Sequence, residues 1–264
     1  MGLCKVPKIS WLLILLPISR RPVVALIQAR MGSTRFPGKM MADLCGFPII
    51  YWVLKRVSLA TTLDQVVLTT SEAERDDPLI GVAKDLGLNT FRFEHEGDVL
   101  GRFCGAAKAA GAATVLRVCA DNPVVDPEFI DHAVCSFSES EADYAFNHIP
   151  RLDNGYPDGL GAEVMCADLL YEIDGLATSE FHREAATSYI WDNLDRYSVL
   201  AVDCPAEWHT LGDDIRLDVD WPGDLDRMRA LCAGLPMSTS AIEFLARWRH
   251  LYGNIQQHLY AERR

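Results

Sequence analysis

Short apolar segments that alternate with amphipathic helical patterns are the feature that most constrains the fold of this chain. Such alternation is typical of a mostly parallel sheet with helices on both faces. With 264 residues, 49% of them hydrophobic, the chain can bury one large core of this kind. Strands are expected over residues 23–28, 65–70, 90–93 and 113–119, and helices over residues 48–58, 78–86 and 101–110.

The second half of the chain keeps this α/β pattern less regularly. The stretch 143–204 mixes strands with helices and interrupts the alternation, so we expect it to form a lobe inserted into a single domain that spans residues 22–264. Strands are expected over residues 144–148, 162–166, 198–203 and 217–219, and helices over residues 128–137, 222–231 and 240–251.

The amino terminus has a different character. Lys5 and Lys8 precede an apolar run over residues 11–16, as in a signal peptide, but Pro17 and Arg20 follow it in place of a small-residue cleavage site. The run is also far shorter than the roughly 20 residues that span a bilayer. We therefore expect residues 1–21 to be an extension outside the fold, and the chain to work in the cytoplasm without a membrane anchor.

A loop rich in glycine, hydroxyl groups and cations follows the first expected strand. Backbone N–H groups and cations that converge in this way bind polyanions. The two glycines allow close backbone approach and positive φ, arginine grips phosphate bidentately, and lysine acts as a point charge. We interpret the loop as a triphosphate cradle; a solvated basic turn is the alternative, and the spacing is not that of the G-x-x-x-x-G-K-[ST] loop. Its sequence is Ala29-Arg30-Met31-Gly32-Ser33-Thr34-Arg35-Phe36-Pro37-Gly38-Lys39.

The overall charge excludes some classes of partner. The chain has 25 Lys and Arg against 37 Asp and Glu, a formal net charge of −12, so nonspecific binding to nucleic acid or to an anionic membrane is not expected. A triphosphate site in so acidic a chain requires a local concentration of positive charge, which the 29–39 loop supplies. The 8 cysteines form no C-x-x-C pair and are expected to be small core residues.

The motifs together resemble those of a known family of enzymes. The chain is similar to the cytidylyltransferases that activate acidic sugars: the acylneuraminate and 3-deoxy-manno-octulosonate (KDO) enzymes, and most nearly the SpsF-like branch of spore coat polysaccharide biosynthesis proteins. The resemblance covers residues 23–231 and rests on the loop at 29–39 and on the segments 98–102, 116–123, 156–160, 183–189 and 217–225.

The resemblance implies both a fold and an activity. The fold is a Rossmann-like, mostly parallel sheet of the nucleotide-diphospho-sugar transferase type, with the inserted lobe used for dimerisation and sugar binding. The activity is transfer of CMP from CTP to an acidic sugar, a nonulosonate or a KDO-like acid, with release of pyrophosphate, for surface polysaccharide or glycan biosynthesis. The implied partners are CTP, the acidic sugar and a second copy of the chain, and the implied cofactor is Mg²⁺.

Site residues follow from the matched motifs. The resemblance implies that the nucleotide is bound by Ala29, Arg30, Met31, Gly32, Ser33, Arg35, Lys39 and Arg102. Arg30, Lys39 and Asp121 are the implied catalytic residues. The implied sugar-binding residues are Asp158, Glu163, Arg183, Glu184 and Tyr189. Arg183 can pair with a substrate carboxylate, and a surface charge beside Glu184 is the alternative for it.

Two aspartates are expected to hold the metal ion. Nucleotidyl transfer must neutralise charge on the α-phosphate and on pyrophosphate, a task usually given to Mg²⁺ held by one or two carboxylates. Asp121 and Asp220 each follow an expected strand, where ligands of open α/β sheets collect. The alternatives are an Asx turn before Pro123 for Asp121 and helix capping for Asp220. Asp218 is a second-choice ligand, and Asp224 is better explained as a partner of the helix dipole.

Two other functions remain open at this stage. Asp218-Val219-Asp220 also fits the D-x-D metal motif of a GT-A type glycosyltransferase that uses a nucleotide sugar. A catalytically silent sugar-nucleotide-binding subunit is the third possibility, although it would have no need of the aspartates. Release of pyrophosphate distinguishes the cytidylyltransferase from both.

Overall fold

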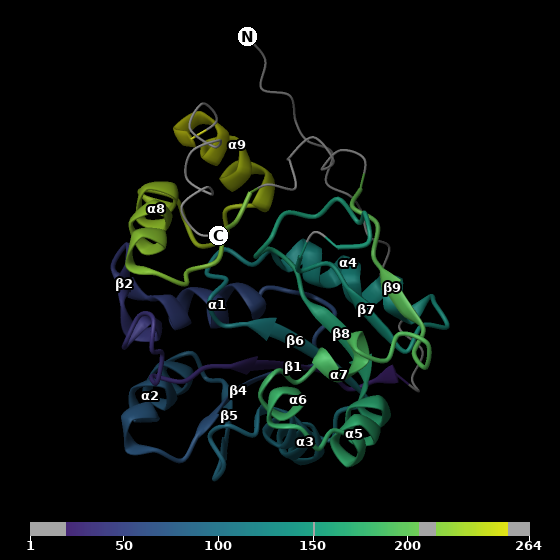
Figure 1. The fold of residues 1–264 in the computed structure, drawn as a ribbon. Helices are drawn as coiled ribbons and strands as arrows, with labels where there is room; N and C mark the ends of the chain where they lie inside the picture. The colour runs from purple at the N-terminus through teal and green to yellow at the C-terminus, as the bar shows by residue number, and fades with distance from the viewer. Residues whose placement is uncertain (1–19, 150, 206–214, 253–264) are drawn as a thin grey trace.

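The structure is a computed structural model, and it describes residues 20–149, 151–205 and 215–252. A seven-stranded sheet lies at its centre (Figure 1). In spatial order the strands are β5 (Asn89–Phe93), β4 (Gln65–Ser71), β1 (Val23–Gln28), β6 (Thr114–Cys119), β8 (Glu163–Cys166), β7 (Tyr144–Phe146) and β9 (Val199–Ala201). The first four are parallel, β8 runs antiparallel to both of its neighbours, and β9 is parallel to β7.

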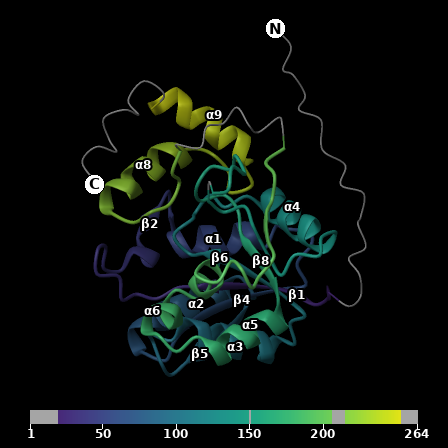
Figure 2. The ribbon, with the colours of Figure 1, turned by 45° about the vertical axis from the view of Figure 1, so that its right-hand side comes forward.

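Helices cover both faces of the sheet, as Figures 1 and 2 show. One face packs against α1 (Ile49–Val57), α2 (Asp77–Asp85) and α4 (Pro127–Ser138), with α8 (Pro222–Cys232) and α9 (Ala241–Tyr252) joining the same core. The other face packs against α3 (Val99–Ala110), α5 (Ala167–Leu176) and α7 (Ser188–Trp191), and α6 (Glu180–Glu184) contacts α3. A short hairpin, β2 (Asp43–Leu44) and β3 (Phe47–Pro48), lies beside α8.

The first strand shows why this sequence forms a doubly covered sheet. Residues 23–27 are all fully buried, as expected of a parallel strand with helices on both faces. Ala25 and Ile27 belong to the core on the side of α1, while Val24 and Leu26 belong to the core on the side of α3. An uninterrupted apolar run is therefore required here, in place of the polar and apolar alternation of a half-exposed strand.

Most of the elements expected from the sequence are present, with boundaries that differ by at most two residues. The strand expected over residues 217–219 is wrong. Residues 217–219 belong to no strand, and only the preceding residue, Arg216, forms an isolated bridge, with Asp158. The N–H groups of this segment donate to two separate loops, from Leu217 to the carbonyl of Asp158 and from Val219 to the carbonyl of Asp121, so no ladder forms.

The stretch 143–204 is continuous with the main sheet, because β7, β8 and β9 extend it beyond β6. Of the expected extension, residues 1–19 lie outside the described residues. Arg20, however, contacts the fold: its guanidinium donates to the carbonyl oxygens of Phe137, at 3.0 Å, and Ser140, at 3.1 Å. Among the described residues, no helix has the length and apolar character that crossing a membrane requires.

Candidate active site

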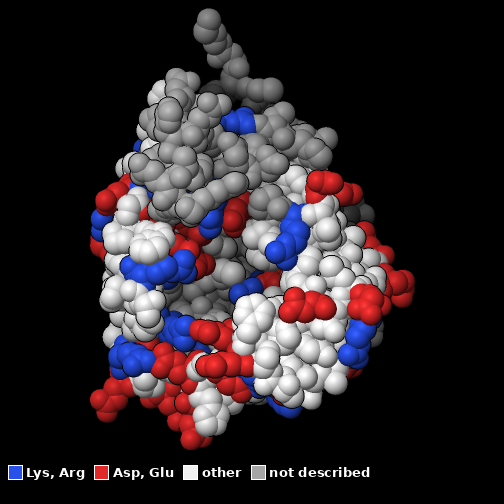
Figure 3. All heavy atoms as spheres, viewed as in Figure 1, with Lys and Arg blue, Asp and Glu red and all other residues white. Residues whose placement is uncertain are grey.

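A pocket of about 410 Å³ opens at the carboxyl ends of β1 and β6. These strands are neighbours, with Gln28 opposite Cys119, so the 29–39 loop and Asp121 emerge side by side. On the face of the molecule in Figure 3 a hollow is visible, with Lys and Arg as well as Asp and Glu around it. Of the expected site residues, Ala29, Arg30, Gly32, Ser33, Arg35, Lys39, Asp121 and Glu184 line the pocket. Gln28, Thr34, Met40, Arg117, Val118, Cys119 and Ala120 complete the lining.

The loop is held in shape by a buried carboxylate that the sequence reasoning missed. Asp76 accepts a hydrogen bond from the backbone N–H of Met31, at 2.8 Å, and further bonds from the hydroxyls of Ser71 and Thr70. Burial alone raises the pKa of Asp76, but these hydrogen bonds outweigh it and the pKa is lowered. The backbone of Met31 therefore anchors the loop near the end of β4. Met31 is not among the residues that line the pocket. Of the two glycines from which positive φ was expected, Gly38 adopts it, at 74°, and Gly32 does not.

Lys39 joins the two sides of the site. Its Nζ lies 3.3 Å from Oδ2 of Asp121 and 3.4 Å from Oδ1 of Asp220, and it donates to the carbonyl oxygen of Val219 at 2.9 Å. Arg35 donates to the other oxygen of Asp220 at 2.8 Å. The two aspartates expected as metal ligands thus converge on one ammonium group, although 99 residues separate them along the chain (220 − 121).

The donor set fits a divalent cation that also binds substrate. Two carboxylates already share a cation here, and Mg²⁺ typically takes one or two protein carboxylates while phosphates and water complete its shell. Among the described residues, no group of three or more His, Cys, Asp or Glu side chains is arranged to hold a metal by itself. Asp224, expected to be a partner of the helix dipole, caps α8, since its carboxylate accepts hydrogen bonds from the N–H groups of Asp220 and Trp221.

Arg30 and Arg102 differ in their access to the pocket. Arg30 lines it and donates to Glu184 at 2.9 Å, so α6 contributes to the pocket wall. Arg102 is fully buried and donates to the carbonyl oxygen of Glu96 at 2.6 Å. Its Nε and Nη1 have no hydrogen-bond partner in the described part of the chain. Burial and the nearby Arg30 lower the pKa of Arg102. Because Arg102 is fully buried and does not line the pocket, this structure does not place it in direct contact with a nucleotide, against the expectation.

Two of the expected sugar-binding residues have structural partners instead. Arg183 donates from Nε and Nη2 to both carboxylate oxygens of Asp98, at 2.8 and 2.7 Å, and from Nη1 to Asp174. Because Asp98 caps α3, this fork ties α6 to α3, and it leaves the Arg183 guanidinium engaged away from the pocket lining. Tyr189 lies on α7, where its hydroxyl accepts a bond from Arg196, and it does not line the pocket either.

Asp158 lies near the carboxylates of Asp121, Asp218 and Asp220, which form the acidic side of the site. Its carboxylate lies 3.5 Å from Arg216, which also binds both oxygens of Asp218. Burial and the neighbouring Asp218 raise the pKa of Asp158 to about 6. Gly159 adopts φ of 94° and packs against the backbone of Leu217 and Asp218, where a Cβ would lie only 3.1 Å from the nearest backbone atom.

The expectation for Glu163 needs correction. It is only 1% exposed, so in this structure it cannot contact a ligand directly. Its carboxylate accepts bonds from Arg117, which lies opposite it on β6, and from the hydroxyl of Tyr144. Arg117 does line the pocket, and the sequence reasoning missed it. The available signal was that arginine is the single charged residue of the expected strand 113–119.

The fold and the site define a class of protein. A mostly parallel α/β sheet, a cation-rich loop after its first strand and carboxylates facing that loop are the features of a nucleotidyltransferase. More particularly, the chain belongs to the cytidylyltransferase family, since the model of that family matches residues 24–233.

Individual relatives agree with this assignment. The chain is similar to the spore coat polysaccharide biosynthesis protein SpsF of Bacillus subtilis, with 31% identity over 230 residues that cover 84% of this chain and 92% of the relative. It is 32% identical over 120 residues to a 3-deoxy-manno-octulosonate cytidylyltransferase of Geobacter sulfurreducens, covering 46% of this chain and 47% of that protein. The solved structure of a cytidylyltransferase from Leptospira borgpetersenii matches with a TM-score of 0.80 and 25% identity, over 89% of this chain and 97% of that one.

Proposed function

We propose that this protein transfers CMP from CTP to an acidic sugar and releases pyrophosphate, as a step in the biosynthesis of a surface polysaccharide or glycan. The observation that carries the proposal is the position of Lys39, the last residue of the cation-rich loop, whose ammonium group lies between Asp121 and Asp220. This arrangement suits a triphosphate bound by the cations of the loop, with the two carboxylates available to hold a divalent cation that neutralises it. KDO and the N-acylated nonulosonates are the candidate sugars, because of the similarity to the KDO enzyme of Geobacter sulfurreducens.

The reaction needs little covalent participation by the protein. A hydroxyl of the sugar attacks the α-phosphorus and gives up its proton to water, a new oxygen–phosphorus bond forms, and the bond to pyrophosphate breaks. Arg30, Arg35 and Lys39 bind and neutralise the phosphates, while the loop backbone orients them. Asp121 and Asp220 would hold Mg²⁺, which supplies charge neutralisation at the α-phosphate and at the departing pyrophosphate.

The direct test is a screen for pyrophosphate release. The purified protein is incubated with each of the four NTPs, with Mg²⁺ and with a panel of 2-keto-3-deoxy sugar acids that includes KDO and N-acetylneuraminate. Release that requires both CTP and one of these acids is the expected result. Activity with GTP or UTP alone would contradict the choice of base and leave the reaction type standing.

The same screen, together with a measurement of thermal stability, separates the two alternative functions. A GT-A type glycosyltransferase consumes a nucleotide sugar and releases no pyrophosphate. A silent sugar-nucleotide-binding subunit would be stabilised against heat by CTP with Mg²⁺ but would turn over none of the sugars. We also retain the predictions of a homodimer and of a cytoplasmic location, which sedimentation velocity and cell fractionation test.

A further inference from the structure

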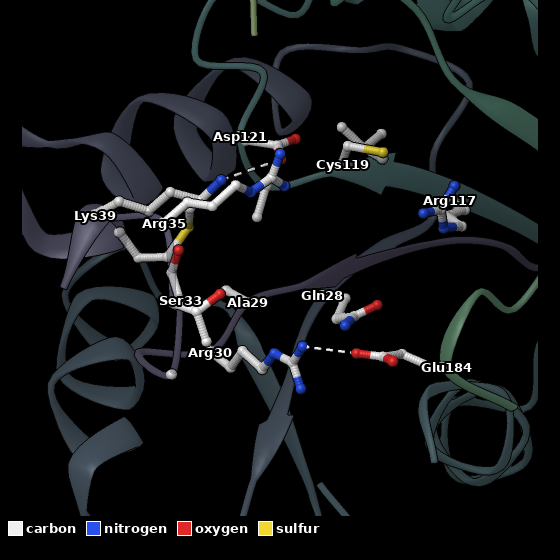
Figure 4. A pocket seen from close by; sticks show the side chains of 15 residues that line it. Gln28, Ala29, Arg30, Ser33, Arg35, Lys39, Arg117, Cys119, Asp121 and Glu184 are labelled. Carbon is white, nitrogen blue, oxygen red and sulfur yellow. Dashed lines mark hydrogen bonds and ion pairs between the residues drawn. The ribbon is translucent and has the colours of Figure 1, made fainter. Parts of the chain in front are cut away.

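Four cationic side chains line the pocket, and three of them lie on the loop or at its end. Lys39 and Arg35 contact the carboxylates on the acidic side, and Arg30 lies between Glu184 and Glu96. Arg117 is the fourth, and it comes from β6 instead of the loop. In Figure 4 it lies at the opposite end of the pocket from Lys39 and Asp121, with Cys119 and Gln28 between.

The position of Arg117 is determined by a buried carboxylate. Glu163 faces it directly across the β6–β8 pair, and this carboxylate is almost completely shielded from solvent. A buried charge is costly unless it is paired, so the pair strongly favours one orientation of the guanidinium. The hydroxyl of Tyr144 donates to the second oxygen of Glu163, and burial raises the pKa of Tyr144, which keeps that hydroxyl protonated. Protein groups therefore satisfy both oxygens of Glu163.

The guanidinium of Arg117 keeps donors for a ligand. Its side chain is 22% exposed, and the one hydrogen bond that it makes to a described residue runs from Nη1 to Glu163. His148 lies close by, with Nε2 3.9 Å from Glu163. Burial, together with Arg117 and Arg151, lowers the pKa of His148 to about 3, so it is neutral and does not compete as a cation.

We propose that Arg117 binds the carboxylate of the sugar acid, and that Glu163 is the positioning residue that holds it toward the pocket. This inference rests on the proposed function and names the recognition element for its substrate class. The carboxylate of the sugar acid needs a cation that is not already neutralised by the triphosphate, and a guanidinium fork matches a carboxylate in geometry and charge. Arg183, the residue expected from the sequence, is already held by Asp98 and Asp174.

The test compares a sugar acid with its carboxamide. Pyrophosphate release is measured with CTP and either KDO or N-acetylneuraminate, and with the amide of each. Wild-type protein is expected to prefer the acid. Arg117→Met is expected to raise KM for the acid by about tenfold to a hundredfold, as for loss of a hydrogen bond to a charged group, and to remove the preference over the amide. KM for CTP should stay unchanged.

Variants of the partner control for folding. Arg117→Met leaves the carboxylate of Glu163 buried without a cation, so the double variant Arg117→Met with Glu163→Gln removes both charges and should show the same loss of preference. Glu163→Gln alone should raise KM for the acid by a smaller factor, with kcat and KM for CTP unchanged, because the guanidinium remains but its anchor is weaker. A purely structural role for Glu163 would alter both KM values together.

Several results would overturn the inference while the proposed function stands. These are an unchanged acid preference in Arg117→Met, a rise in KM for CTP in its place, or loss of the preference in Arg183→Met. If wild-type protein releases no pyrophosphate with any pair of substrates, the proposed function fails instead. Calorimetric titration of KDO and N-acetylneuraminate then decides the inference: binding to wild type that is absent in the double variant supports it, and equal binding or none at all refutes it.

Discussion

Replacing Lys39 with methionine tests the centre of the proposed site. The change removes the ammonium group but keeps an unbranched side chain of similar length. In the structure this group lies 3.3 and 3.4 Å from two carboxylates and 2.9 Å from a backbone carbonyl oxygen, and the side chain is 11% exposed. Little solvent is therefore available to replace these contacts.

The size of the effect follows from these distances. Coulomb's law at an effective dielectric constant of about 20 gives roughly 5 kcal/mol for each pair of charges at this separation. Desolvation and lost side-chain entropy offset most of that attraction, which leaves a net contribution of about 1.5–3 kcal/mol for a hydrogen bond to a charged group. When phosphates are bound, the same group faces charge that develops during transfer. Loss of one such contact lowers kcat by about a hundredfold to a thousandfold.

The assay is steady-state pyrophosphate release with CTP and a saturating sugar acid. Lys39→Met should lose at least about a hundredfold in kcat/KM for CTP, while its thermal unfolding shows that the fold is retained. Lys84→Met is the matched control, since Lys84 is an exposed lysine on α2 and should behave as wild type. Pyrophosphate release at the wild-type rate by Lys39→Met would refute the reasoning.

Three further predictions concern the framework of the site. Asp76→Asn should lower the free energy of unfolding by about 1–3 kcal/mol. Because folding lowers the pKa of Asp76, the stabilisation by its carboxylate is present above the ordinary carboxyl range and is lost as pH falls through the lowered pKa. In urea unfolding, the difference in stability between the variant and wild type should therefore become smaller between about pH 7 and about pH 3. Gly161→Ala places a Cβ against the backbone of Asn147 and should lower the free energy of unfolding by about 1–3 kcal/mol in the same assay. Gly223→Ala is the control, because its Cβ meets open space and should not destabilise the protein. Equal stability of the two variants would contradict this prediction. Arg56→Met breaks a buried ion pair and should cost about 3–5 kcal/mol, and a cost below about 1 kcal/mol would show that the pair is not needed.

Local pattern was sufficient for most of the fold. The apolar run in β1 and the helical spacing in α1 are properties of neighbouring residues, and their periodicity identifies the element without its partners. The segment 217–219 shows where such reasoning stops. Leu217 and Val219 alternate with Asp218 as in a strand, but a strand requires a continuous neighbour, and here two different loops accept the hydrogen bonds of the segment.

The same division applies to the site. By itself the sequence determined the cation-rich loop and the two aspartates, because each motif is contiguous and its residue types carry the chemistry. Only the tertiary structure decided which side chains meet. Asp220 lies 181 residues from the lysine that it contacts, Arg117 is paired across two strands with a carboxylate sealed from solvent, and Arg183 is taken up by the cap of another helix. Such contacts depend on which elements pack together and on which side chains are buried between them. Neither can be predicted from the local sequence pattern.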